Sequence, residues 1–384
     1  MIAHRTAGIL PPKPHTAFRD AEGRLHYEEM FTRGGFSGAF TYFYHRNPIT
    51  PSRGVALSAR GFEQPTPAEG KEPLKRRLYD SNKILPGGAP IDRRVPVLFN
   101  RDVTVSLVRA AQSDDVYFAN GDGDELWFVH EGAARLESPC GWLDVTAGDY
   151  VWVPHAMIHR WHVERELRAM VFEAPDGITI PQDFRNPVGQ LKMDAPYTYR
   201  DFVFPEGPLA QDGPRKLIGK KKNIFSEYTL AHAPMDVVGW DGFVYPWAFS
   251  IEKYQPKTGL VHLPPTIHST FASRGFLICS FVPRVVDYHP QAIPCPYPHS
   301  SVDCDEIILY LRGNFTSRKG VGPGCISLHP SGISHGPHPG AYEKSIGTTR
   351  TDELAVMCDT YEPLVATEQG RAIEVAGYHE TWSD

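Results

Sequence analysis

Short apolar or alternating segments, separated by turn residues, dominate the sequence from Val103 onward. In the first half of the chain these segments lie at 103–111, 125–132, 133–138, 150–155, 160–164 and 168–174. Such segments are typical of β-strands, and a content of 34 glycines and 35 prolines disfavours long helices. The spacing predicts an antiparallel sandwich or small barrel, closed so that no strand edge stays bare.

The same pattern returns in the second half of the chain. Strand-like segments recur at 258–263, 275–284, 305–313, 325–330 and 354–362. A chain of 384 residues is too long for one small core. We therefore expect an all-β protein with a duplicated barrel, in which residues 1–205 contain the first barrel and residues 206–384 contain the second.

The other segments read as irregular. About the first ninety residues are interrupted by many Pro and Gly residues, and they predict a loop-rich N-terminal arm that covers the barrels. One short helix is expected over 364–376. The basic run of Lys220, Lys221 and Lys222 favours a solvated linker face, and a funnel for an acidic substrate is the alternative.

Composition excludes several classes of protein. The net charge of −6 offers no basic surface and argues against nucleic acid as a partner. No run of eighteen apolar residues occurs, and the first residues lack the apolar core of a signal peptide, so we expect a cytoplasmic protein with no membrane partner. The six cysteines show no CxxC pair, and we expect them to be reduced thiols, most of them packing residues.

One stretch of the first block resembles a conserved element of cupin barrels. Gly148 and Asp149 precede apolar residues and Pro154, and the chain then turns inward to His159. A metal-binding cupin also needs a His-x-His pair from the preceding hairpin, and residues 120–127 contain no histidine. We therefore interpret the first barrel as a metal-free scaffold, in which His155, His159 and His162 are core or surface residues.

The second block has a fuller set of metal-binding side chains. His299 precedes an apolar strand, Glu306 begins it, and His335 follows the next strand and turn. Two imidazoles and one carboxylate that meet inside a barrel form the facial triad of non-haem Fe(II) oxygenases, which leaves positions open for substrate and dioxygen. Each residue also has a structural interpretation, such as a loop cap or an ion pair. Their concentration in one short segment favours a site, because unpaired buried polar groups are costly.

These motifs resemble those of the homogentisate 1,2-dioxygenases, and the resemblance is firmest from about residue 241 to residue 344. The most specific match is Ser327-Leu328-His329 followed by His335-Gly336-Pro337. The other matching pieces are the segments 262–267 and 296–299, Glu306, and Arg312-Gly313. The resemblance implies a bicupin, with two cupin-type β-barrels, a loop-rich N-terminal arm and few short helices.

The resemblance also implies a role for individual residues. The Fe(2+) ligands would be His299, Glu306 and His335, and the active-site base would be His262, on a strand facing the ligands. Tyr297, His329, Phe315 and His335 would surround the substrate. The implied reaction opens the ring of homogentisate with dioxygen and gives maleylacetoacetate, in tyrosine and phenylalanine breakdown. The implied assembly is a homo-oligomer, either a trimer or a hexamer.

Two departures from the family pattern leave alternatives open. The interval from His299 to Glu306 is one residue longer than expected, so Asp303 and Asp305 remain alternative carboxylate ligands. Phe315 stands where the family has a tyrosine, so gentisate, hydroquinone or a substituted salicylate are alternative substrates. A non-catalytic bicupin for binding or storage is an alternative of another class, and the clustered set of site residues argues against it.

Overall fold

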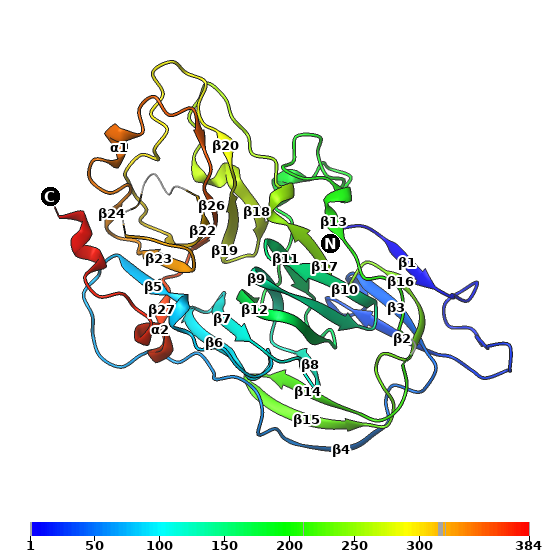
Figure 1. Cartoon of the computed structure of the whole chain (residues 1–384). Helices are drawn as coiled ribbons and strands as arrows, with labels where there is room; N and C mark the ends of the chain where they lie inside the picture. The colour runs from blue at the N-terminus through cyan, green and yellow to red at the C-terminus, as the bar shows by residue number, and fades with distance from the viewer. Residues whose placement is uncertain (1, 210, 314–317, 319, 384) are drawn as a thin grey trace.

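The structure, a computed structural model, describes every residue except 1, 210, 314–317, 319 and 384. Strands make up most of its regular structure, as the sequence predicts (Figure 1). The α-helices that it describes are short, α1 (Ala341–Lys344) and α2 (Glu368–Ala372). The helix expected over 364–376 is therefore shorter than predicted, because its first residues pair as β27 (Val365–Ala366).

The largest sheet builds the first cupin-type barrel. Its two longest strands, β9 (Asp124–Ser138) and β12 (Arg160–Ala174), pair antiparallel along most of their length, and their core-facing residues are buried. The order across the sheet is β13 (Phe202–Val203), β17 (Trp247–Ser250), β11 (Asp149–Val153), β9, β12, β7 (Thr104–Ala110), β6 (Arg94–Phe99) and β27, and β10 (Gly141–Thr146) pairs with β9.

A smaller sheet completes the first barrel. Its order is β4 (Ser52–Leu57), β15 (Ile224–Leu230), β14 (Arg215–Lys221) and β8 (Tyr117–Asn120). Strand β14 carries Lys220 inward, where its buried ammonium pairs with Glu173 and lies 3.3 Å from Asp122. The interpretation of Lys220 as part of a solvated face is therefore wrong, whereas Lys221 and Lys222 are exposed.

The N-terminal arm contains more strands than its sequence suggests. The strands β1 (Arg5–Gly8), β2 (Tyr27–Thr32) and β3 (Phe40–His45) form a sheet with the distant β16 (Val237–Gly242), in the order β1-β16-β3-β2. Frequent Pro and Gly hide these strands in the sequence, and the partner that β1 and β3 share, β16, lies far along the chain. A further strand of the arm, β5 (Arg77–Asp80), joins the second barrel.

The second cupin-type barrel holds the residues that the sequence singled out. The order of its main sheet is β18 (Ser269–Ala272), β19 (Phe276–Phe281), β26 (Leu354–Thr360), β22 (Asp305–Arg312), β23 (Cys325–His329) and β5. Two short ladders lie beside it, β20 (Arg284–Val285) with β25 (Arg350–Thr351) and β21 (His299–Ser300) with β24 (Ser334–His335). The division at residue 205 stays a prediction, and strands from either side of it enter each barrel.

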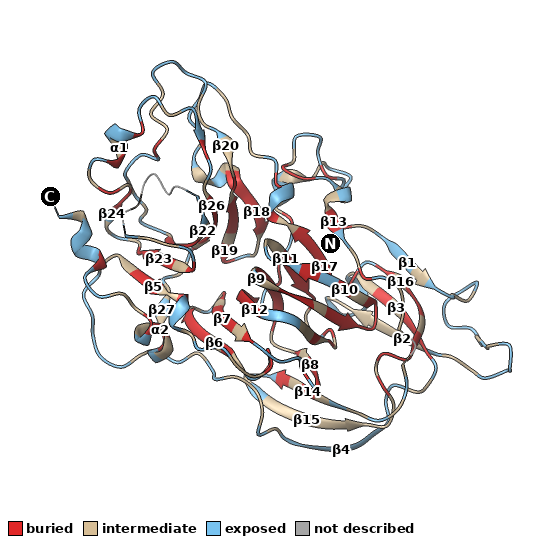
Figure 2. Cartoon of the chain, viewed as in Figure 1, coloured by how far each residue is buried: buried red, intermediate tan, exposed pale blue. Residues whose placement is uncertain are grey.

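The two barrels share one hydrophobic core. The core includes aromatic residues of β11 and β17 together with Phe271 and Cys358 from the second barrel, and Figure 2 shows buried residues concentrated on the strands between the barrels. The hydroxyl groups of Tyr150 and Ser280 join the barrels by a 2.9 Å hydrogen bond. All six cysteine thiols are free, as expected. Among the described residues, no helix is long and apolar enough to cross a bilayer.

Candidate metal centre

Three side chains that the sequence singled out meet at one end of the second barrel. Donor atoms of His299, Glu306 and His335 all lie within 4.8 Å of one another. The two histidines are direct partners across the β21–β24 ladder, and their ring centroids are 4.2 Å apart. The set has the composition of the 2-His-1-carboxylate triad that binds non-haem Fe(II).

The two imidazoles are placed for metal binding by their surroundings. Nδ1 of His299 lies 3.3 Å from the carbonyl oxygen of Tyr297, which leaves Nε2 available to a metal. Both ring nitrogens of His335 are buried and have no hydrogen-bond partner among the described residues, and Nε2 is one of them. Since buried polar groups are normally paired, this unpartnered nitrogen fits a metal ligand.

The carboxylate of Glu306 is held ionised inside the barrel. His329 Nδ1 lies 2.6 Å from its Oε1, and Arg318 Nη2 lies 3.8 Å from the same atom. Burial raises the pKa of Glu306, but the hydrogen bond and charge of His329, followed by the charge of Arg318, bring this pKa to about 2. Burial, and then the charge of Glu306, raise the pKa of the neighbouring Asp359 to about 8. At neutral pH the pair therefore carries mainly the charge of Glu306.

The aspartates that the sequence left open as ligands lie elsewhere. Asp305 accepts hydrogen bonds from the backbone N–H groups of Ser331 at 2.7 Å and Leu364 at 2.8 Å, so each carboxylate oxygen braces a loop. Asp303 is exposed. Of these carboxylates, the structure brings only Glu306 together with the two histidines among the residues that it describes.

His329 lies directly behind the metal-binding set. Its ring stacks on that of His335 at 5.2 Å. Burial and the charge of Arg318 lower the pKa of His329 to about 4, so the ring is neutral at neutral pH. A carboxylate can only accept, so Nδ1 carries the proton that it donates to Glu306. Nε2 is then the lone-pair nitrogen, and it is buried with no partner among the described residues.

His262 and Tyr297 lie farther out. His262 is exposed in a loop, not on a strand, because no ladder forms before Pro264 and Pro265. Its ring lies 5.0 Å from that of Tyr297, which lies 6.4 Å from that of His299. The rings therefore form a series from the surface toward the metal-binding set.

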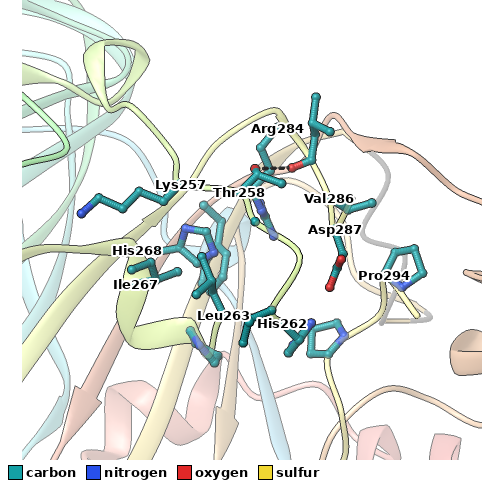
Figure 3. A pocket seen from close by; sticks show the side chains of 16 residues that line it. Lys257, Thr258, His262, Leu263, Ile267, His268, Arg284, Val286, Asp287 and Pro294 are labelled. Carbon is teal, nitrogen blue, oxygen red and sulfur yellow. Dashed lines mark hydrogen bonds between the residues drawn. The ribbon is translucent and has the colours of Figure 1, made fainter. Parts of the chain in front are cut away.

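Two pockets flank His262. One is lined by residues from 257 to 296, with His262 and Asp287 among them, and appears in Figure 3. The other also contains Tyr297 and His289. Phe315, the remaining predicted substrate residue, lies outside the described residues.

The first barrel repeats the backbone framework of this centre without the histidine pair. Phe118 and His159 exchange backbone hydrogen bonds of 2.7 and 2.9 Å. They are paired as His299 and His335 are in the second barrel, so Phe118 corresponds to His299 and His159 to His335. Glu125 follows Phe118 by the same interval that separates Glu306 from His299. The interval is therefore shared by both barrels of this chain, and it needs no special bulge.

A matching aspartate confirms this correspondence. Asp124 accepts hydrogen bonds from the backbone N–H groups of His155 and Ile178, as Asp305 does from Ser331 and Leu364. His155 and Ser331 each follow a proline. The signal was present in the sequence, since Asp-Glu stands at the second and third positions of both GDELWFVHEG and CDEIILYLRG, but only the contacts show that it marks one repeated framework.

In the first barrel a protein cation faces the glutamate. Nη1 of Arg94 lies 2.6 Å from Glu125, and Nη2 lies 3.1 Å from Glu173. Asn120 donates to both carboxylates. Burial raises the pKa of Glu125, but Arg94 and His159 bring this pKa to about 2. A buried guanidinium thus compensates the charge that a metal would otherwise compensate.

Comparison with known proteins identifies the relatives of this chain. A model of the N-terminal part of homogentisate 1,2-dioxygenase matches residues 97–251. A protein of Saccharolobus solfataricus, whose name proposes a dioxygenase, is 34% identical, and the match covers 100% of this chain and 99% of that protein. The chain belongs to the homogentisate 1,2-dioxygenase family. It is thus a member of a dioxygenase family.

Members of this family that are named for their substrate are more distant. Homogentisate 1,2-dioxygenase of Bradyrhizobium diazoefficiens is 27% identical over 66% of this chain, and the matched region is 59% of that enzyme. The enzyme of Legionella pneumophila is 26% identical, with 66% and 64% covered. A solved cupin protein of Leptotrichia buccalis covers 74% of the chain at 10% identity and a TM-score of 0.36. This likeness is too low to support the fold, which rests on the strand order of the two barrels.

Proposed function

We propose that this protein is an Fe(II)-dependent dioxygenase that cleaves an aromatic ring, with homogentisate as substrate and maleylacetoacetate as product. The observation that carries the proposal is the meeting of His299, Glu306 and His335 donor atoms within 4.8 Å. Family membership supports it. The partners would be the small aromatic substrate and dioxygen, in tyrosine and phenylalanine catabolism.

The donor set fits iron in composition and charge. Two neutral imidazoles and one carboxylate would leave a bound Fe(II) with net positive charge, which favours an anionic substrate. When bound, Fe(II) supplies a centre that holds substrate and dioxygen together and passes electron density between them. A zinc hydrolase would need an activating glutamate motif that the sequence lacks.

The residues around the set can handle the protons of a hydroquinone. We propose that a ring nitrogen of His262 accepts the proton of the substrate hydroxyl beside the side chain, from the edge of its pocket. Nε2 of His329 can accept a hydrogen bond from the substrate, but the low pKa of this residue makes it a poor proton carrier at neutral pH. We assign Tyr297 to the substrate wall between His262 and His299.

The alternatives concern the substrate and the assembly. Phe315 cannot donate the hydroxyl hydrogen bond of the tyrosine that the family pattern has at this position, and this keeps gentisate, hydroquinone and substituted salicylates as alternative substrates. By family resemblance we propose a cytoplasmic homo-oligomer, a trimer or a hexamer.

Oxygen uptake after anaerobic loading with Fe(II) tests the proposal. The panel is homogentisate, gentisate, hydroquinone and salicylate, and protein with His299→Ala is the control. Uptake with homogentisate and a ring-opened product support the proposal. Uptake with another member of the panel alone would reassign the substrate. Stoichiometric iron without uptake on any of them would favour a binding protein and overturn the catalytic assignment.

A further inference from the structure

The C-terminal turn of the chain packs on the segment that carries His335. This turn, η7 (Tyr378–Trp382), lies beside β23 and β24 in Figure 1. The indole of Trp382 stacks on the ring of His338, with centroids 3.7 Å apart and planes inclined by 27°. Thr381 Oγ1 lies 2.7 Å from Nε2 of the same histidine. His338 is 1% exposed, and η7 forms part of its cover.

Two arginines hold the peptide groups on either side of His335. Nη2 of Arg76 donates to the carbonyl oxygen of Ser334 at 2.6 Å, and Nη1 of Arg318 donates to that of Gly336 at 2.8 Å. The guanidinium of Arg76 also lies 4.8 Å above the ring of Trp382. Arg76 therefore joins the C-terminal turn to the strand that bears the histidine.

The local ladder alone cannot hold His335 rigidly. Strand β24 has two residues, and within the described part of the chain it pairs with the two residues of β21 alone. A metal ligand must be held to within about 0.5 Å by neighbouring packing and hydrogen bonds. Contacts from outside the ladder must therefore provide much of this rigidity. Arg76, from the N-terminal arm, supplies one at Ser334, and η7 packs on the nearby His338.

We propose that Trp382 is a positioning residue for the metal centre, and that it acts through His338 and Arg76 on the segment that carries His335. The ring of Trp382 also lies 6.1 Å from that of His329, so Trp382 borders His329 as well as His338. The inference rests on the proposed function to the extent that His299, Glu306 and His335 bind a metal.

Co(II) affinity of the full-length apoprotein, measured anaerobically at a temperature where every variant is folded, tests this role. Trp382→Ala should weaken Co(II) binding by about 10- to 100-fold, the usual effect of losing a residue that supports a metal ligand. Trp382→Phe keeps an aromatic face for His338 and should stay within about threefold. Arg76→Met removes the hydrogen bond to Ser334 and should weaken binding in the same direction.

A tryptophan far from the site provides the control. Trp240 is 1% exposed on β16 in the N-terminal sheet, and Trp240→Ala should lower the melting temperature without changing Co(II) affinity. Unchanged affinity in Trp382→Ala, or an equal loss in Trp240→Ala, would overturn the positioning role. If Trp382→Ala does not fold, the Arg76→Met variant decides, and a Co(II) affinity equal to that of the unmodified protein would overturn the positioning role. A failure of the proposed function would give a different result. The protein would then take up no oxygen, while its Co(II) affinity would still depend on Trp382.

Discussion

His299 and His335 face each other across the ladder of β21 and β24, and their ring centroids lie 4.2 Å apart. The ladder brings together residues from the two ends of one short segment, and Glu306 reaches them from strand β22. Metal binding in this protein should therefore depend on a very small piece of backbone.

Loss of either histidine should remove the iron. We expect near-stoichiometric iron in the unmodified protein and little in His299→Ala or His335→Ala, because two remaining ligands bind Fe(II) weakly. His159→Ala, at the corresponding place in the first barrel, should keep its iron. Metal analysis of purified, folded variants checks this, and iron retained after either second-barrel change would refute the assignment.

Glu306 and Asp305 should differ in what they control. Glu306→Gln should weaken iron binding strongly, since it removes the anionic ligand and keeps the shape. Asp305→Asn should instead cost about 1–3 kcal/mol of stability, because its two oxygens accept backbone hydrogen bonds. Denaturant unfolding and iron titration of both variants separate the effects. The reverse pattern would make Asp305 the ligand.

Substitution of His262 should affect turnover and little else. Its side chain is exposed, so His262→Ala should keep the fold and the iron and lose turnover by about two to four orders of magnitude. His268, buried nearby against Phe281, is the control, and His268→Ala should lower stability. Near-normal oxygen uptake by iron-loaded His262→Ala would remove His262 from the mechanism.

Arg94 should be a major stabilising residue of the first barrel. Arg94→Met leaves Glu125 and Glu173 buried without their guanidinium partner, and we expect a loss of about 3–5 kcal/mol. The partly exposed pair of Arg109 and Glu166 offers a comparison, and Arg109→Met should cost about 1 kcal/mol or less. Urea unfolding measures both. Equal effects would show that the Arg94 network adds no particular stability.

The protein should lose stability in mild acid through His268. Burial and the charge of Arg284 lower the pKa of His268 to about 3. The unfolded chain binds this proton near pH 6.5 and the folded chain only near pH 3, so stability falls as the pH decreases between these values. Melting temperatures of unmodified protein and His268→Leu should converge toward low pH. Parallel curves would contradict the assignment to His268.

The sequence was sufficient to predict that His299, Glu306 and His335 come together, but not how the neighbouring residues are arranged. His299, Glu306 and His335 could be identified because their types and spacing are unusual within one short segment. The exposure of His262 could not be predicted, since it depends on a ladder that does not form. The burial of Lys220 could not be predicted either, because its partner Glu173 comes from a strand far away in the sequence.

The strands of the N-terminal arm were missed for a similar physical reason. Strands β1 and β3 both pair with β16, about two hundred residues away, and local sequence propensity does not report such a distant partner. The repeated Asp-Glu framework was visible in the sequence. Its meaning required the observation that Asp124 and Asp305 brace equivalent turns.

The guanidinium of Arg94 gives the two halves of the protein different sensitivities to their surroundings. A cation that is covalently part of the chain cannot be removed by a chelator or exchanged for another ion. On the proposed function, iron starvation would therefore act on the second barrel, while the charge balance around Glu125 stays constant. The first barrel can then preserve the shared core, including the Tyr150–Ser280 contact, while the neighbouring barrel awaits a new metal ion.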